Sequence, residues 1–197
     1  MAHMEHTQVG DVERLGQALG ELPEPMVAPP FIVVSGLPGS GKSYLCRRLE
    51  ERLHYPIIES DAMRKVLFPV PSHSLEESAR LFSALHLLIA GLLGKGIPLI
   101  FDATNLIERN REELYRIAAR AGARLIMVRV EAPPEVVRQR LAQRQMGADP
   151  EDRSDADWQV YRQMRHSAER IRRNHFAVDT SRDIAPAIDR IVRAATR

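Results

Sequence analysis

Cysteine is almost absent from the sequence, and the features of secreted and membrane proteins are lacking. Only one of the 197 residues, Cys46, is a cysteine, so no disulfide can form within the chain, and Cys46 is expected to be a small buried side chain. No apolar stretch reaches the length that spans a membrane, and residues 1–30 are polar and dotted with proline, unlike a signal peptide. These absences favour a cytoplasmic protein without a membrane partner.

A strong excess of one charge is lacking too. The 28 Lys and Arg residues nearly balance the 26 Asp and Glu residues, and the formal net charge of +2 is too small to hold a nucleic acid by bulk electrostatics. Aromatic residues make up 5% of the chain, so no row of rings for stacking bases is evident. Arginine carries nearly all the positive charge, which suits bidentate binding of anions or reflects a compositional bias of the genome equally well. The histidines show no metal-ligand spacing, so zinc is not expected.

The most specific motif follows the apolar run 31–34, which has the pattern of a buried strand. Residues 36–43 read Gly-Leu-Pro-Gly-Ser-Gly-Lys-Ser and fit G-x-x-x-x-G-K-[ST] at every fixed position. Glycines let backbone N–H groups close around a phosphate chain, and a helix that begins near Lys42 points the positive end of its dipole at the same anion. We therefore expect a nucleoside triphosphate here, contacted by Gly36, Leu37, Pro38, Gly39, Ser40, Gly41, Lys42, Ser43 and Tyr44. The chain has no N-K-x-D guanine motif, which favours ATP.

Strands alternate with helices along most of the chain. The pattern predicts strands at 31–34, 56–60, 97–101, 124–130 and 175–178. It predicts helices at 44–53, 74–94, 107–121, 134–146, 155–173 and 184–195. This alternation is typical of an α/β protein with a parallel five-stranded sheet and helices on both faces, here the P-loop NTPase three-layer sandwich.

Length and hydrophobic content favour one domain. At 197 residues, 44% of them hydrophobic, the chain can bury one core. We expect residues 28–197 to form it, with a helical lid over about 134–173. Residues 1–27 are expected to be a tail or a short helix with a proline-rich linker, and residues 1–4 look like a cloning remnant.

Polar residues follow the third predicted strand, and ligands of such sheets bind outside the carboxyl ends of the strands. Asp102 closes the apolar run 97–101, which is typical of the acidic residue that organises Mg²⁺ opposite a P-loop serine. Taken alone, the same aspartate would fit a helix cap equally well. Paired with Ser43, Asp102 is the expected magnesium residue.

Asp61 and Arg64 follow the second predicted strand and lie one helical turn apart. A carboxylate there can accept the proton of an attacking hydroxyl, and an arginine beside it can hold an anionic group of the acceptor. The plainer alternative is an aspartate at a helix N-terminus with a surface salt bridge three residues on.

Arg140 and Arg144 are spaced i, i+4 on the helix predicted after the fourth strand, close to a turn at 147–150. Two arginines on one face of a closing lid would neutralise charge on a phosphoryl group in transfer, and they are expected to contact ATP. A solvated arginine-rich face is the alternative.

Together these motifs resemble P-loop kinases of the polynucleotide 5′-hydroxyl kinase type and the small bacterial P-loop kinases that share their core. The resemblance covers about residues 31–182. It rests on the P-loop, the pair Asp61-x-x-Arg64, the segment 102–106 with Arg109 and Arg111 behind it, and the lid arginines. Residues 154–158 and 161–165 are similar to the lid-closing helix of the family.

The resemblance implies an ATP- and Mg²⁺-dependent kinase that phosphorylates a hydroxyl acceptor, best a polynucleotide 5′-hydroxyl or a similar anionic group. Asp61 would be the general base, while Arg64, Thr104 and Asn105 would contact the acceptor. The residues expected to stabilise the transferring phosphoryl group are Lys42, Arg140 and Arg144, and those expected to place Mg²⁺ are Ser43 and Asp102.

Two other functions fit the same motifs. Related groups use a similar scaffold to phosphorylate antibiotics, sugars, nucleosides or nucleotide sugars, so the acceptor could be a small molecule. A regulatory ATPase or switch, whose output is its nucleotide state, is an alternative of another class. The sequence carries no signature of transporter or remodelling ATPases, and it does not predict an oligomeric state.

Overall fold

The computed structural model describes residues 2–145 and 156–197. Its centre is a parallel sheet with the strand order β2-β3-β1-β4-β5. The strands are β1 (Pro30–Ser35), β2 (Ile57–Glu59), β3 (Leu99–Asp102), β4 (Arg124–Glu131) and β5 (Phe176–Asp179). The predicted α/β fold with a parallel five-stranded sheet is thereby confirmed.

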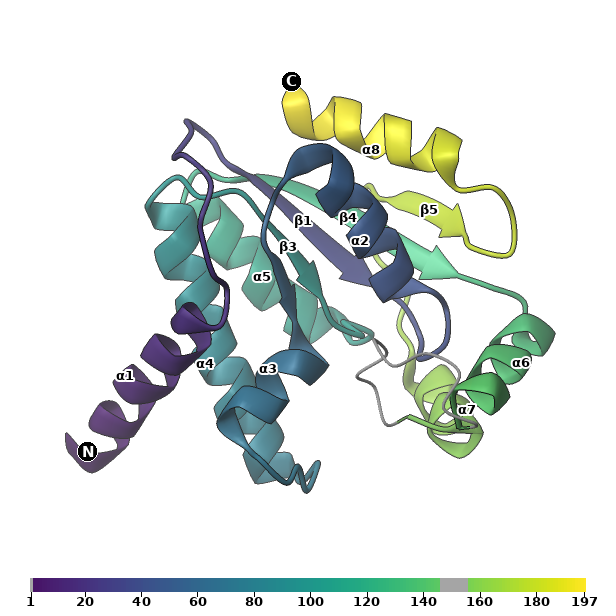
Figure 1. The fold of residues 1–197 in the computed structure, drawn as a ribbon, viewed down its shortest axis with the longest axis horizontal. Helices are drawn as coiled ribbons and strands as arrows, with labels where there is room; N and C mark the ends of the chain where they lie inside the picture. The colour runs from purple at the N-terminus through teal and green to yellow at the C-terminus, as the bar shows by residue number, and fades with distance from the viewer. Residues whose placement is uncertain (1, 146–155) are drawn as a thin grey trace.

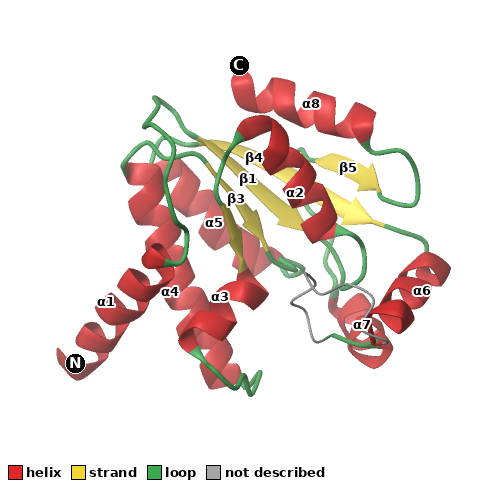
Figure 2. Cartoon of the chain, in the orientation of Figure 1, coloured by secondary structure: helices red, strands yellow, loops and turns green. Residues whose placement is uncertain are grey.

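Helices cover both faces of the sheet, and β1 shows why. Ile32 and Val34 pack toward α2 (Lys42–Leu53) and α8 (Ala185–Thr196), whereas Phe31 and Val33 belong to the core on the opposite face. Strand residues alternate between faces, so a strand that is apolar throughout must be covered on both. Figures 1 and 2 show α2 and α8 on one side of the sheet and the other core helices on the far side. These are α1 (Ala2–Gln17), α3 (Ser60–Leu67), α4 (Leu75–Gly94) and α5 (Glu108–Arg120).

Two helices, which we call the lid helices, lie beyond the carboxyl ends of the strands: α6 (Pro134–Gln145) and α7 (Trp158–Ser167). The second was expected to continue to residue 173, but it ends at Ser167, and residues 168–175 belong to no helix or strand. The turn expected at 147–150, and the first two residues of the segment 154–158, lie outside the described residues.

The N-terminal helix is longer than predicted and packs on the domain. It begins at Ala2, inside the stretch interpreted as a cloning remnant. Leu15 is completely buried in the core beside α4, and Asp11 pairs with Arg80 of α4 through two hydrogen bonds of 2.6 and 2.8 Å. The helix therefore contributes to the core and is not a tail.

Within 2–145 and 156–197, α4 is the one helix long and apolar enough to cross a membrane, which the sequence analysis did not anticipate. The core helix of a soluble protein meets the same criterion. Leu81, Leu85 and Ile89 of α4 are completely buried in the core shared with α1 and α5. We therefore assign α4 to the protein core.

The register of the sheet brings the ends of three strands level. Val34 pairs with Asp102, and Asp102 pairs with Glu59. The residues that follow these positions, in the P-loop, at Ala103 and at Ser60, therefore meet at one edge of the sheet. The active-site motifs predicted from the sequence start at this edge.

Candidate active site

The P-loop, residues 36–43, has little room for side chains. A Cβ at Gly36 would lie 2.5 Å from the carbonyl oxygen of Val130 in β4. Gly41 has a φ of 90°, and a Cβ there would lie 2.9 Å from Oγ1 of Thr180. Glycine is needed at both positions, at the first because of the close approach and at the second also because of the left-handed backbone. The loop thus keeps its backbone exposed to a ligand, and Lys42 Nζ donates to the carbonyl of Leu37 at 3.3 Å across it.

One cavity of about 470 Å³ collects most of the predicted site residues. Lys42, Ser43 and Asp61 line it from α2 and α3, and Arg140 and Arg144 line it from α6. The full lining set is Pro38, Gly39, Gly41, Lys42, Ser43, Tyr44, Arg47, Glu59, Ser60, Asp61, Asp102, Ala103, Thr104, Arg140, Gln143 and Arg144. A volume of this size is typical of small-molecule sites.

Ser43 and Asp102 form a hydrogen-bonded pair at the floor of the cavity. Ser43 Oγ donates to Oδ2 of Asp102 at 2.8 Å, and Asp102 is only 3% exposed. Burial raises the pKa of Asp102, while the charge of Lys42 and the bond from Ser43 oppose that rise and the charge of Asp61 adds to it. A buried carboxylate beside a hydroxyl suits a hard divalent cation, whose charge would offset the cost of burying the anion. The pair therefore fits Mg²⁺.

Cys46 lies behind this pair on the same helix. Its side chain is completely buried, as expected from the sequence, and it is hydrogen-bonded to Asp102. Burial raises the pKa of the Cys46 thiol well above its usual value, and the negative charge of Asp102 raises it further. The thiol is therefore protonated and serves to pack and orient the carboxylate.

Thr180, directly after β5, connects the P-loop with α6. Its Oγ1 donates to the carbonyl of Ser40 at 2.6 Å. Arg140 donates to Oγ1 of Thr180 at 2.8 Å and to its carbonyl at 2.9 Å, and lies 3.4 Å from the carbonyl of Gly39. The hydrogen bonds of the Arg140 guanidinium within 2–145 and 156–197 thus go to neutral oxygens of the P-loop and of Thr180, which hold it beside the P-loop.

Arg64 does not lie where the sequence predicted. It is 7% exposed and does not line the cavity; its Nη1 donates to Oε1 of Glu77 in α4 at 2.5 Å. Glu77 also accepts bonds from the backbone and side chain of Ser72. Burial alone would raise the pKa of Glu77, but the bonds from Ser72 and Arg64 lower it to about 2. Arg64 therefore joins α3 to α4, and its side chain is not at the cavity where an acceptor contact was predicted.

Asn105 is also structural, in contrast to the prediction. Its side chain is buried and its Nδ2 donates to the carbonyl of Val34 at 2.9 Å. Its neighbour Thr104 does line the cavity, while the Thr104 carbonyl accepts bonds from Gly36 N at 3.1 Å and Ser35 Oγ at 3.1 Å. The loop after β3 is thus tied to β1, and Thr104 is the residue of the pair that lines the cavity.

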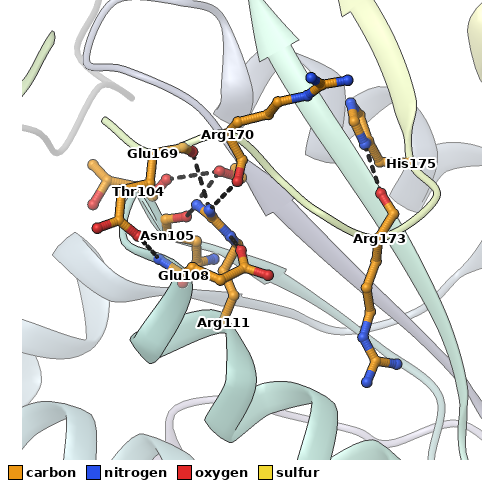
Figure 3. Close-up of polar contacts among 9 residues, drawn as sticks. Thr104, Asn105, Glu108, Arg111, Glu169, Arg170, Arg173 and His175 are labelled. Carbon is orange, nitrogen blue, oxygen red and sulfur yellow. Dashed lines mark hydrogen bonds and ion pairs between the residues drawn. The ribbon is translucent and has the colours of Figure 1, made fainter. Parts of the chain in front are cut away.

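Arg111 anchors the same loop from below, as Figure 3 shows. It is completely buried, its Nε donates to Glu108 at 2.7 Å, and its Nη1 donates to the carbonyl of Asn105 at 2.6 Å. Its Nη2 donates to the carbonyls of Glu169 and Arg170 at 3.0 and 3.1 Å. Arg111 therefore fixes the segment after α7 to the loop after β3.

Leu37 is one of three predicted nucleotide-contact residues that do not line the cavity of Asp61. It packs with Val137, Leu141 and Tyr161 beneath the lid helices. Gly36 and Ser40, also expected at the nucleotide, line the neighbouring cavity on that side of the P-loop rather than the cavity of Asp61.

Several residues that line the cavity were not predicted from the sequence. Arg47 follows Ser43 by four positions on α2, and Gln143 follows Arg140 by three on α6, so helical spacing from the motif residues could have found both. Thr180 left no such signal, because it reaches the P-loop only through the pairing of β5 with β4.

Comparison with known proteins supports the architecture. A family model described as an AAA domain matches residues 31–171, more than half of the chain. A UPF0200 protein of Aeropyrum pernix is 28% identical over 131 residues, which cover 60% of this chain and 67% of that protein.

Two solved structures share the fold over most of their length. Kti12 of Chaetomium thermophilum, in complex with ADP-AlF3, is 25% identical with a TM-score of 0.65, over 84% of this chain and 99% of that one. APS kinase of Mycobacterium tuberculosis, in complex with AMPPNP and APS, is 19% identical with a TM-score of 0.62, over 88% and 100%. On these grounds the chain belongs to the AAA domain family and has a P-loop kinase-like fold.

Proposed function

We propose that this protein is an ATP- and Mg²⁺-dependent kinase that transfers the γ-phosphate to a hydroxyl group, with a polynucleotide 5′-hydroxyl or a similar anionic acceptor as the leading candidate. The proposal rests on one observation. Asp61, a carboxylate that lies outside the P-loop, lines the same cavity as Lys42 and Ser43. A carboxylate at that position can take the proton of an acceptor hydroxyl.

In this proposal the triphosphate lies along the P-loop, with Lys42 on its β- and γ-phosphates. Ser43 and Asp102 would hold Mg²⁺, which neutralises phosphate charge when bound. Arg140 and Arg144 on α6 would contact the γ-phosphoryl group as charge moves during transfer. Support comes from the related folds that were solved with ADP-AlF3 or with AMPPNP.

Asp61 takes the proton of the acceptor hydroxyl. The acceptor oxygen then forms a bond to the γ-phosphorus while the bond to the β,γ-bridging oxygen breaks, and ADP leaves. Most of the rate enhancement comes from positioning and electrostatic stabilisation, because the protein forms no covalent bond in this step.

A small-molecule acceptor is favoured by one observation. Arg64, the residue expected to hold an anionic acceptor, is committed to Glu77, and Asn105 is committed to Val34. The acceptor side of the cavity then presents Asp61, Thr104, Ser60 and Glu59, whose side-chain oxygens suit the hydroxyl groups of a neutral acceptor.

The experiment is transfer of label from γ-labelled ATP with Mg²⁺ to a panel of acceptors. The panel holds 5′-hydroxyl DNA and RNA oligonucleotides, nucleosides, sugars and aminoglycosides. Asp61→Asn is the test variant, and Glu112→Gln, an exposed carboxylate on α5, is the matched control. Labelled oligonucleotide that is lost only in Asp61→Asn supports the leading acceptor. Label on a small molecule alone moves the substrate to that class, and label on nothing but phosphate contradicts the kinase.

A further inference from the structure

The segment between α7 and β5 presents exposed arginines. Residues 168–175 have no regular structure, and Ile171 is buried while Arg170, Arg172 and Arg173 are exposed. Residues 170–175 line an open hollow of about 480 Å³. Arg170 and Arg172 flank the buried Ile171, and both are exposed.

The backbone of this segment is held in place while its side chains are left to solvent. Arg111 binds the carbonyls of Glu169 and Arg170, and Figure 3 shows the Arg170 side chain leading away from that cluster. Farther on, the Arg173 guanidinium lies 4.3 Å from the centre of the Tyr115 ring. Anchoring lowers the entropy that the segment would lose on binding a ligand.

Its positive charge is not cancelled by nearby acids. Among residues 2–145 and 156–197, neither Arg170 nor Arg172 has an ion pair with a carboxylate. The acid nearest in sequence, Glu169, accepts a 2.7 Å bond from the backbone N–H of Glu108 at the start of α5. Exposed arginines occur in α7 as well, at Arg162 and Arg165.

We propose that the segment 170–175, with Arg170 and Arg172 as its main contacts, docks the phosphate backbone of a nucleic-acid strand. The inference rests on the proposed function and specifies its acceptor. The hydrogen bonds of Arg111 join this segment to Asn105, and the adjacent Thr104 lines the cavity of Asp61. The segment is therefore linked through the buried Arg111 to the loop that lines the site of phosphoryl transfer.

The chemistry favours a nucleic acid over a membrane surface. Guanidinium groups bind phosphate oxygens through two parallel hydrogen bonds. Binding to a membrane interface also needs apolar side chains that insert between lipids. None of the exposed large hydrophobic residues of the described chain lies between 156 and 175.

The test measures binding of a fluorescent single-stranded 5′-hydroxyl oligonucleotide by anisotropy over a range of salt concentrations. The test variant is Arg170→Ser/Arg172→Ser, which leaves Arg173 on Tyr115 and the Arg111 contacts to the backbone intact. The matched control, Arg190→Ser/Arg193→Ser, removes the same charge from exposed positions on α8. We expect the test variant to bind at least about tenfold more weakly and to lower the slope of log K against log salt by about 1.4, because two phosphate contacts with a single strand are lost. The control should bind like wild type.

Equal weakening in both variants, or no binding by the wild type, would overturn the proposal. So would a loss of binding to anionic phosphatidylserine vesicles in the test variant with oligonucleotide binding unchanged. A nucleoside has no phosphate backbone to dock on the arginines. Phosphorylation of a nucleoside therefore tests the kinase proposal independently of this inference. If binding depends on Arg170 and Arg172 but no acceptor is ever phosphorylated, docking stands and the kinase proposal fails.

Discussion

Ser43 Oγ lies 2.8 Å from Oδ2 of Asp102, and the two residues come from α2 and β3, 59 positions apart in the chain. The parallel pairing of β1 with β3 brings them together, because the P-loop follows β1 directly. Asp102 is thus a buried acid that already accepts a hydrogen bond from the P-loop hydroxyl, an arrangement that suits the binding of a cation.

Ser43→Ala and Asp102→Asn are expected to raise the Mg²⁺ concentration needed for half-maximal phosphoryl transfer by about tenfold or more, a size typical of altered metal surroundings. The measurement is a Mg²⁺ titration at saturating ATP, with Ser78→Ala as a control serine outside the cavity. Unchanged Mg²⁺ dependence in both variants would leave the pair with a structural role only.

Asp61→Asn is expected to lower kcat by about 10² or more while ATP binds as in the wild type, since loss of a general base affects the chemical step. The measurements are kcat with the best acceptor of the panel and the Kd for ATP by calorimetry. If kcat stays near the wild-type value, Asp61 belongs to the alternative considered from the sequence, a residue at the start of α3.

Arg64→Ala is expected to lower the melting temperature by several degrees and to leave the KM of the acceptor unchanged, because Arg64 is paired with Glu77 away from the cavity.

The pKa of Glu77 is lowered to about 2 in the folded protein, so the stability it contributes is present above the ordinary carboxyl pKa near 4.5 and is lost as the pH falls toward 2. Melting curves from pH 7 to pH 2 should therefore show a smaller acid-induced drop for Glu77→Gln than for wild type between about pH 4.5 and pH 2. If Arg64→Ala instead weakened acceptor binding and left the melting temperature unchanged, the structural assignment of Arg64 would be reversed.

Thr180→Val is expected to raise the KM for ATP about fivefold with kcat less affected, since valine keeps the shape but loses the Oγ1 bonds to Ser40 and Arg140, worth about 1 kcal/mol net. Thr180→Ser should restore the wild-type KM. A wild-type KM in Thr180→Val would mean that the carbonyl of Thr180 alone positions Arg140.

The strands of the fold were predictable because they are short apolar runs bounded by turn residues. The run 31–34 became β1 (Pro30–Ser35), and the predicted helix 74–94 became α4 (Leu75–Gly94). The end of α7 was not predictable, since residues 168–173 are mostly good helix formers. The helix stops because Arg111 takes the carbonyls of Glu169 and Arg170 and because Leu106 accepts the N–H of Glu169. These partners lie about 60 positions away, outside any local pattern.

The same limit explains the site residues that were placed wrongly. The motif fixes the spacing of Asp61 and Arg64, but periodicity does not say which way Arg64 points once Glu77 in α4 offers a buried partner. Asn105 pairs with Val34, 71 positions earlier, and no sequence pattern shows that contact. The positions of Lys42 and Ser43 at the cavity were predictable because the P-loop motif specifies a strand-loop-helix unit, and that of Asp102 because it closes an apolar strand.

The central claim, transfer of the γ-phosphate from ATP to an acceptor hydroxyl, is tested most directly with one assay. Wild-type protein and Lys42→Ala are incubated with γ-labelled ATP, Mg²⁺ and the acceptor panel, and their melting temperatures are compared. The account predicts a labelled acceptor with wild type and none with Lys42→Ala, at equal melting temperatures. Label that appears only as inorganic phosphate, or a Lys42→Ala protein that labels the acceptor at a near-normal rate, would contradict it.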